Sequence, residues 1–376
     1  MNALLACLRQ DLRTDLELLE RMVNIESPSV DKALVDRFVQ FLGSRFVALG
    51  GAVEYVPAER FGDHLCVRFS GESSERVLLL GHTDTVFAAG HAARRPFRID
   101  NGKAMGPGVL DMKAGILLML SSIRALLQNG GRLRRSVTVL LTCDEEVGSP
   151  SSRSLVESEA RQARAVLVLE PSLPGGVLKT ARKGVGKFTV KAIGRAAHAG
   201  VYPSKGVNAI QEIAHQVLKL QRMSDNRSGT TVTVAVVQGG TRANVVPAEA
   251  AIEVDVRIAT SDEGERLTKA LRALSPELPG ARLEVRGGIN RPPMERNADT
   301  ARLFALARSI AAEMGIDLHE GATGGASDGN LTSALGIPTL DGLGAVGDGA
   351  HGEDEFVDVS SLPVRAALIA GLIQGV

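Results

Sequence analysis

The amino-acid sequence predicts an α/β fold with a mostly parallel sheet, into which a smaller α+β domain is inserted. Up to about Lys179, continuous apolar runs of strand length alternate with long helical patterns. Such runs are typical of parallel strands that are buried on both faces. Beyond Lys179 the strands alternate apolar and polar residues, and helical patterns return after Arg291. We therefore expect a sheet domain formed by residues 1–182 and 291–376, interrupted by an inserted domain at 183–290.

Length, charge and cysteine content limit the class of protein. The chain has 376 residues, enough for two domains, and its 43 basic side chains equal its 43 acidic ones. Zero net charge provides no basic surface for nucleic acid or for a membrane. Three scattered cysteines do not form a disulfide framework. Without a basic signal-peptide start or a run of about 18 apolar residues, we expect a cytoplasmic protein that binds neither nucleic acid nor membrane.

The expected elements follow in chain order. The first segment begins with two helices, an amphipathic one from Leu4 to Leu19 and another at 31–49. Its strands are expected at 53–56, 65–69, 76–81, 137–142 and 165–169, and its further helices at 112–127, closed by Gly130 and Gly131, and at 149–159.

The inserted segment has a different order of elements. Strands are expected at 187–193, 231–237 and 250–258, and helices at 206–223 and 263–274. A strand-helix-strand-strand order with a second helix indicates a ferredoxin-like domain. The last segment is expected to contain helices at 300–314 and 364–373 and a short strand at 335–340.

Polar side chains follow the apolar runs of the first segment, where the strands end. They are His82, Asp84, Glu145, Glu146 and Glu170, together with Asp111 in a glycine-flanked loop. Because ligands bind at the carboxyl ends of strands in open α/β sheets, these side chains are expected to converge. Imidazole with several carboxylates and no cysteine suits Zn²⁺, Mn²⁺ or Co²⁺. Crowded carboxylates repel one another unless cations neutralise them, which favours a pair of metals that share one carboxylate.

The two adjacent glutamates suggest two different tasks. One carboxylate could be held by a metal while its neighbour takes a proton from water. The alternative is an acidic turn solvated at the surface, and the residues of the turn alone do not decide between them.

Longer motifs contain the same residues. They read GHTDTV at 81–86, GPGVLDMKAG at 106–115, DEEVG at 144–148, LEP at 169–171, GRAAHAG at 194–200 and TGGASD at 323–328. In this order they resemble the motifs of the dinuclear zinc aminoacylase/carboxypeptidase family, over nearly the whole chain. That family includes acetylornithine deacetylase, succinyl-diaminopimelate desuccinylase and the glutamate carboxypeptidases of the carboxypeptidase G type, and the last branch is the most similar.

The resemblance implies a metal site and a division of the domains. Two Zn²⁺ ions would bind per chain, with Co²⁺ or Mn²⁺ as substitutes. His82 and Glu170 would hold one ion, Glu146 and His351 the other, and Asp111 would bridge them. Residues 1–182 and 291–376 would be the catalytic domain, and residues 183–290 a lid through which a homodimer forms.

The resemblance also implies roles in catalysis and substrate binding. Asp84 would orient His82, and Glu145 would be the general base that takes a proton from the bridging water and passes it to the leaving nitrogen. His198 would stabilise the oxyanion in the active site of the partner subunit. The side chains near the substrate would be Asn244, Arg257 and Arg291, and an arginine such as Arg291 suits bidentate binding of a carboxylate.

The implied activity is a metallopeptidase that cleaves an amide bond next to a free carboxylate. Its substrate would be a small N-acyl amino acid or peptide with a C-terminal acidic residue such as glutamate. Met112 resembles the deacetylase and desuccinylase branches instead, so an aminoacylase or deacetylase is the alternative. A catalytically silent binding protein is the other alternative, and the intact ligand set argues against it. Simpler interpretations are an exposed loop histidine for His351 and a surface ion pair for Arg291.

Overall fold

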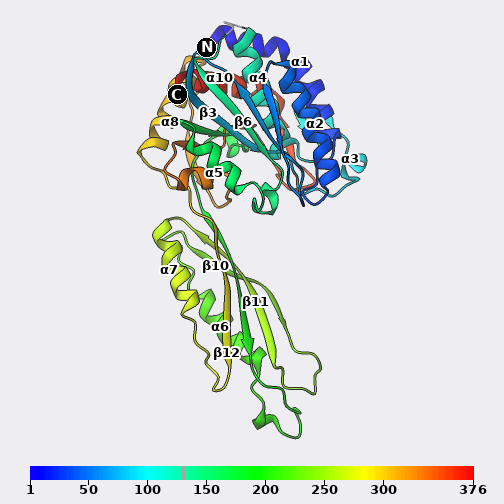
Figure 1. Ribbon diagram of the computed structural model, residues 1–376, viewed down its shortest axis with the longest axis vertical. Helices are drawn as coiled ribbons and strands as arrows, with labels where there is room; N and C mark the ends of the chain where they lie inside the picture. Colours follow the sequence, from blue (N-terminus) through cyan, green and yellow to red (C-terminus); the bar gives the residue numbers. More distant parts are fainter. Residues whose placement is uncertain (129–131) are drawn as a thin grey trace. The chain divides into compact units, whose positions relative to one another are not determined.

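A computed structural model describes residues 1–128 and 132–376, so the predicted helix end at Gly130 and Gly131 lies outside the described residues. The chain forms two compact units (Figure 1). Unit 1 comprises Met1–Ala181, Arg296–Thr323 and Ser327–Val376, and unit 2 comprises Arg182–Glu295 with Gly324–Ala326. Residues 291–295, which the sequence assigned to the sheet domain, thus belong to unit 2.

The six-stranded sheet of unit 1 has the order β1-β2-β6-β3-β7-β14. Its strands are β1 (Ala52–Val56), β2 (His64–Phe69), β3 (Ser73–His82), β6 (Arg135–Thr142), β7 (Ala165–Val168) and β14 (Thr339–Leu340). β6, β3, β7 and β14 are parallel, while β1 and β2 pair antiparallel at one edge. The predicted α/β fold with a mostly parallel sheet is confirmed.

Helices cover both faces of this sheet. They are α1 (Asn2–Asn24), α2 (Lys32–Ala48), α4 (Ala114–Gln128), α5 (Arg153–Arg161), α8 (Ala298–Glu313), α9 (Gly329–Ala334) and α10 (Leu362–Gly375), and a short helix, α3 (His91–Arg94), lies in the connection after β3. Leu79 of β3 packs in the cluster that contains residues of α1, α4 and α10, whereas its neighbours Leu78 and Leu80 pack with α5 and α9. Burial on both faces explains the continuous apolar runs. Among the described helices, none is long and apolar enough to span a membrane.

Two small sheets in unit 1 were not predicted. One is a four-stranded sheet of β4 (Arg98–Asp100), β5 (Lys103–Met105), β15 (Gly347–Asp348) and β16 (Phe356–Asp358), and the other pairs β8 (Leu178–Arg182) with β13 (Glu320–Thr323). The first sheet matters for the site, because β5 leads towards Asp111 and the segment between β15 and β16 carries His351.

Unit 2 has the element order that the sequence predicts for a ferredoxin-like domain, with one more strand. Its elements are β9 (Gly184–Ile193), α6 (Ala209–Gln221), β10 (Thr231–Gly239), β11 (Glu249–Ile258), α7 (Ser261–Arg272) and β12 (Arg282–Arg291). The antiparallel sheet has the order β10-β11-β9-β12. Asn208 and Thr260 cap the N-termini of α6 and α7 through their side-chain oxygens.

Candidate metal centre

The parallel register of unit 1 brings the polar strand ends together. His82, the last residue of β3, lies opposite Thr142, the last residue of β6. Glu145 and Glu146 follow in a single 3₁₀ turn, and Glu170 lies just beyond β7 on the other side of β3. Adjacent parallel strands therefore deliver these side chains to one edge of the sheet.

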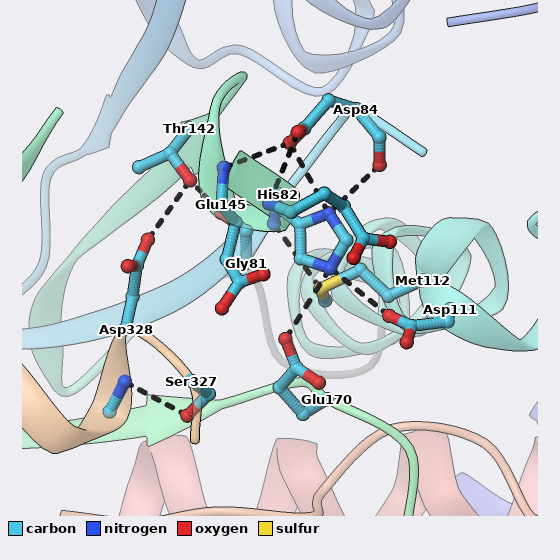
Figure 2. Close-up of polar contacts among 12 residues, drawn as sticks. Gly81, His82, Asp84, Asp111, Met112, Thr142, Glu145, Glu170, Ser327 and Asp328 are labelled. Carbon is cyan, nitrogen blue, oxygen red and sulfur yellow. Dashed lines mark hydrogen bonds and ion pairs between the residues drawn. The ribbon is translucent and has the colours of Figure 1, made fainter. Parts of the chain in front are cut away.

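Asp111 lies at the middle of the cluster, and its two carboxylate oxygens face different imidazoles. Oδ1 is 3.1 Å from Nε2 of His82, and Oδ2 is 3.2 Å from Nε2 of His351. Each imidazole nitrogen also faces a second carboxylate, His82 at 3.4 Å from Oε1 of Glu170 and His351 at 3.3 Å from Oε2 of Glu146. In Figure 2 the carboxylates of Asp111 and Glu170 both point at the His82 ring.

These separations fit metal ions. Zinc bonds of about 2.0–2.1 Å in a tetrahedron place neighbouring ligand atoms about 3.3 Å apart. The cluster thus offers two overlapping sets of donors, His82 with Glu170 and His351 with Glu146, and Asp111 belongs to both. Glu145 also presents a carboxylate oxygen in the cluster, where donor atoms of His82, Glu145 and Glu170 lie within 4.8 Å of one another.

The electrostatics show how strongly this cluster attracts positive charge. Burial lowers the pKa of His82, but hydrogen bonds to the surrounding carboxylates outweigh it and hold that pKa well above its usual value. Hydrogen bonds to Asp111 and Glu146 raise the pKa of His351 to about 10. Burial raises the pKa of Asp111, but the two imidazoles lower it by more, so the net effect is a pKa below its usual value. The surrounding carboxylates thus favour positive charge at this cluster, as expected of a site that suits cations.

Asp84 supports the site by two routes. The Nδ1–H of His82 donates to the main-chain oxygen of Asp84 at 2.9 Å, while the Asp84 carboxylate is 3.5 Å away. That carboxylate accepts the backbone N–H groups of Glu145 and Glu146, both at 3.2 Å, and the hydroxyl of Ser29 at 2.7 Å. Asp84 therefore orients His82 chiefly through its backbone, and its carboxylate fixes the turn of the two glutamates (Figure 2).

Two further carboxylates support the site: Glu355 was missed from the sequence, whereas Asp328 ends the TGGASD motif but was given no role. The buried carboxylate of Glu355 accepts the N–H of Asp111 at 3.0 Å, and burial raises the pKa of Glu355 to about 7. Asp328 accepts the hydroxyls of Thr142, at 3.0 Å, and Ser149 beside the glutamate turn. Glu355 follows other acids in a glycine-rich loop, so the loop sequence does not distinguish it from them. The local signal that could have found it is its position directly before the strand that begins at Phe356.

Residues beside the glutamate turn, and Lys113 after Asp111, have structural contacts. The carboxylate of Asp144 accepts the backbone N–H of Ser151 at 2.6 Å and its hydroxyl at 2.7 Å, near the start of α5. Cys143 is buried with its Sγ 2.9 Å from Nδ1 of His64. Buried Lys113 donates to the main-chain oxygen of Ile25 at 2.8 Å, and burial lowers its pKa to about 7.

The other predicted site residues belong to unit 2. His198 is exposed, and its Nδ1 accepts the N–H groups of Gly200 and Val201 at 3.2 Å. The main-chain oxygen of Asn244 accepts the N–H of Ala199 at 3.0 Å, which ties the His198 loop to the Asn244 loop. Two further arginines complete the set: Arg257 forms a bidentate pair with Asp255, and Arg291 is buried at the end of β12.

The fold and the ligand set together define a metal-dependent hydrolase. The sequence model of the peptidase family M20/M25/M40 matches residues 78–375. The chain belongs to this family, and the family resemblance predicted from its motifs is confirmed.

Known relatives agree with this assignment. Carboxypeptidase G2 of Pseudomonas sp. (strain RS-16) is 32% identical over 366 residues, which cover 96% of this chain and 88% of the relative. Succinyl-diaminopimelate desuccinylases and acetylornithine deacetylases are also similar.

Two solved structures share the fold. The aminopeptidase PepT from Bacillus cereus has a TM-score of 0.80 at 23% identity, with 96% of this chain and 98% of that one covered. The Bacillus subtilis protein YXEP, described as a dinuclear metal-binding peptidase, has a TM-score of 0.75 at 16% identity, with 97% and 98% covered.

Proposed function

We propose that the protein is a dinuclear metallopeptidase that cleaves an amide bond next to a free carboxylate, as a glutamate carboxypeptidase does. The observation that most supports two metals is the carboxylate of Asp111, whose oxygens lie 3.1 Å and 3.2 Å from two different imidazoles. A single carboxylate that faces two donor sets is suited to bridging two cations. His82 and Glu170 would hold one ion, and His351 and Glu146 the other.

The metal ions and Glu145 would have different roles in the hydrolysis. Bound Zn²⁺, Co²⁺ or Mn²⁺ supplies Lewis acidity, which polarises the scissile carbonyl and makes water a stronger acid. Glu145 accepts the proton of the attacking water and donates it to the leaving nitrogen, so that the amine departs neutral. The Asp84 carboxylate holds Glu145 in place by accepting its backbone N–H at 3.2 Å.

Recognition of the substrate carboxylate is assigned to Arg291, with Asn244 and Arg257 as further polar contacts. A guanidinium binds a carboxylate through two parallel hydrogen bonds, which selects an acid over an amide. The 32% identity to carboxypeptidase G2 supports a carboxypeptidase. The resemblance of the motifs to the glutamate carboxypeptidase branch favours glutamate as the C-terminal residue.

A deacetylase or aminoacylase that acts on another N-acyl amino acid is the second candidate. Met112 favours it, because the sequence has methionine next to Asp111 as the deacetylase branch does. In the structure the Met112 sulfur accepts the backbone N–H of His82 at 3.2 Å, so this residue contacts the metal-ligand strand.

A hydrolysis screen distinguishes the two candidates. N-acyl glutamates, folate-like conjugates and dipeptides are compared with N-acetyl and N-succinyl derivatives of basic amino acids, with and without added Zn²⁺ or Co²⁺. Preference for a C-terminal glutamate supports the first candidate. Preference for the basic derivatives supports the second, and no metal-dependent hydrolysis of any of them would contradict both.

We also propose a homodimer through unit 2. β10 is an edge strand of its sheet, and edge strands offer unpaired backbone groups to another chain. An apolar groove of about 690 Å³ runs between β10 and α6, and Val237 and Leu218 beside it are 65% and 61% exposed. Light scattering should find a dimer that Val237→Lys converts into a monomer; a monomeric wild-type protein would contradict this assignment.

A further inference from the structure

Two loops far apart in the sequence supply ligands to the metal centre, and they lie beside each other because of the small four-stranded sheet. The loop at 106–111 follows β5 and ends at Asp111, while the loop at 349–355 precedes β16 and carries His351. β5 and β16 pair antiparallel, with Met105 opposite Phe356. The pairing brings together the ends of the loops that adjoin the strands, but it does not by itself order the loop residues farther from the strands.

Glu355 orders the loop of Asp111. It is fully buried, and its Oε1 accepts the backbone N–H groups of Leu110 at 2.8 Å and Asp111 at 3.0 Å. Its Oε2 accepts the N–H of Gly108 at 2.8 Å. Because the two carboxyl oxygens of one buried side chain accept three backbone N–H groups, they fix the course of the loop at three residues at once.

Arg95 ties the same loop to the loop of His351. One of its terminal nitrogens donates to the main-chain oxygen of Gly352 at 2.8 Å. The other donates to the main-chain oxygens of Gly106, at 3.3 Å, and Glu355, at 3.2 Å, and lies 4.0 Å from the Glu355 carboxylate. A planar, forked donor can reach these three carbonyls at once, whereas an ammonium group presents a single nitrogen.

The loop of His351 needs such support. His351 has φ of +66°, a left-handed conformation that is uncommon for residues other than glycine. Such a conformation persists where surrounding contacts determine it. The contacts of Arg95 with Gly352 and Glu355 are on the residues that follow His351.

We propose that Arg95 and Glu355 are positioning residues that hold the Asp111 loop against the His351 loop and thereby complete the second metal set. This inference rests on the proposed dinuclear centre. The first set keeps His82 and Glu170, which extend from the main sheet, even when the two loops separate. The second set would keep only Glu146 in place, so its metal should be lost first.

The test is a titration of the metal-free, full-length protein with Zn²⁺ against a competing chelator, followed by calorimetry. Wild-type protein should bind two equivalents. Glu355→Gln replaces an acceptor oxygen by an amide that faces backbone donors, and Arg95→Lys removes the fork. Each should weaken binding of the second zinc equivalent by about 10–100-fold, the range typical of residues that support metal ligands. The first equivalent should weaken less, because its set keeps His82 and Glu170 when Asp111 shifts.

Glu212→Gln is the matched control. Glu212 is also fully buried, and its carboxylate accepts the backbone N–H groups of Glu277 and Leu278 at 2.8–3.2 Å, but it lies in unit 2 and touches no metal ligand. It should lower thermal stability without changing either zinc affinity.

Each outcome decides between the inference and its alternatives. If either variant binds both zinc equivalents with wild-type affinity, the inference is overturned. An equal loss of zinc affinity at both sites would overturn it as well. Failure of both variants to fold in the presence of Zn²⁺ would give the contacts a general structural role and would also overturn it. Wild-type protein that binds a single equivalent would instead contradict the dinuclear centre itself.

Discussion

Glu145→Gln separates a general base from a metal ligand. The substitution keeps the size of the side chain and removes its ability to accept a proton. The turn should persist, because it is the backbone N–H of Glu145 that donates to Asp84, at 3.2 Å. Loss of a positioned general base lowers the rate by about 10²–10⁴-fold. At 1.36 kcal/mol per tenfold, that is an activation free energy higher by about 3–5 kcal/mol.

The structure makes the metal content of this variant as informative as its rate. Donor atoms of His82, Glu145 and Glu170 lie close enough to hold one ion together, so a ligand role for Glu145 is the rival interpretation. We propose the ligand role for Glu146 instead, because its Oε2 lies 3.3 Å from Nε2 of His351. The base assignment therefore predicts a slow variant that still binds two zinc ions.

The assay measures kcat, KM and bound zinc on the same preparation. Glu157→Gln is the control, since Glu157 pairs with Arg153 on α5 away from the ligands, and its rate and metal content should not change. Wild-type turnover by Glu145→Gln would refute the base assignment. Loss of zinc together with turnover would make Glu145 a ligand.

Three further predictions test other parts of the site. Zinc binding to metal-free protein at pH 7 should release protons, because His82 and His351 have raised pKa values and bind metal only as neutral imidazoles. The apparent zinc affinity should therefore rise with pH towards about 10. Calorimetry in buffers of different ionisation enthalpy measures the number of protons released. A pH-independent affinity would contradict it. Arg291→Ala should lower kcat/KM for acidic substrates about 10–100-fold, as expected when a charged hydrogen-bond partner worth about 1.5–3 kcal/mol is lost, and equal effects on amidated substrates would remove its assigned role. Inactive His198→Ala and Glu145→Gln proteins, unfolded and refolded together, should regain about a quarter of wild-type activity if His198 acts across a symmetric dimer, whereas no recovery would place His198 within its own subunit or outside the mechanism.

Most of the fold could be predicted because burial leaves a clear pattern. The apolar runs that become β3, β6 and β7 are buried on both faces, so the strands are visible in the sequence. β12 was missed because Gly287 and Gly288 interrupt its alternation. The start of α4 was placed two residues early, since Asp111 and Met112 have non-helical backbone angles in the π-helical turn before Ala114.

The convergence of the polar strand-end side chains could be predicted better than the residues that support them. His82, Glu146 and Glu170 follow apolar strands, where polar residues stand out. Glu355 and Arg95 do not, because their contacts depend on the pairing of two three-residue strands that are distant in sequence. Supporting residues of this kind are defined by tertiary contacts, and local pattern contains little information about them.

The metal content of the active protein tests the dinuclear account most directly. After dialysis against metal-free buffer, elemental analysis of protein with full activity should find close to two zinc, cobalt or manganese ions per chain. A chelator should abolish hydrolysis, and added Zn²⁺ should restore it in proportion to occupancy of both sites. Full activity with one ion per chain would contradict the bridging role of Asp111, and full activity without metal would contradict the whole account.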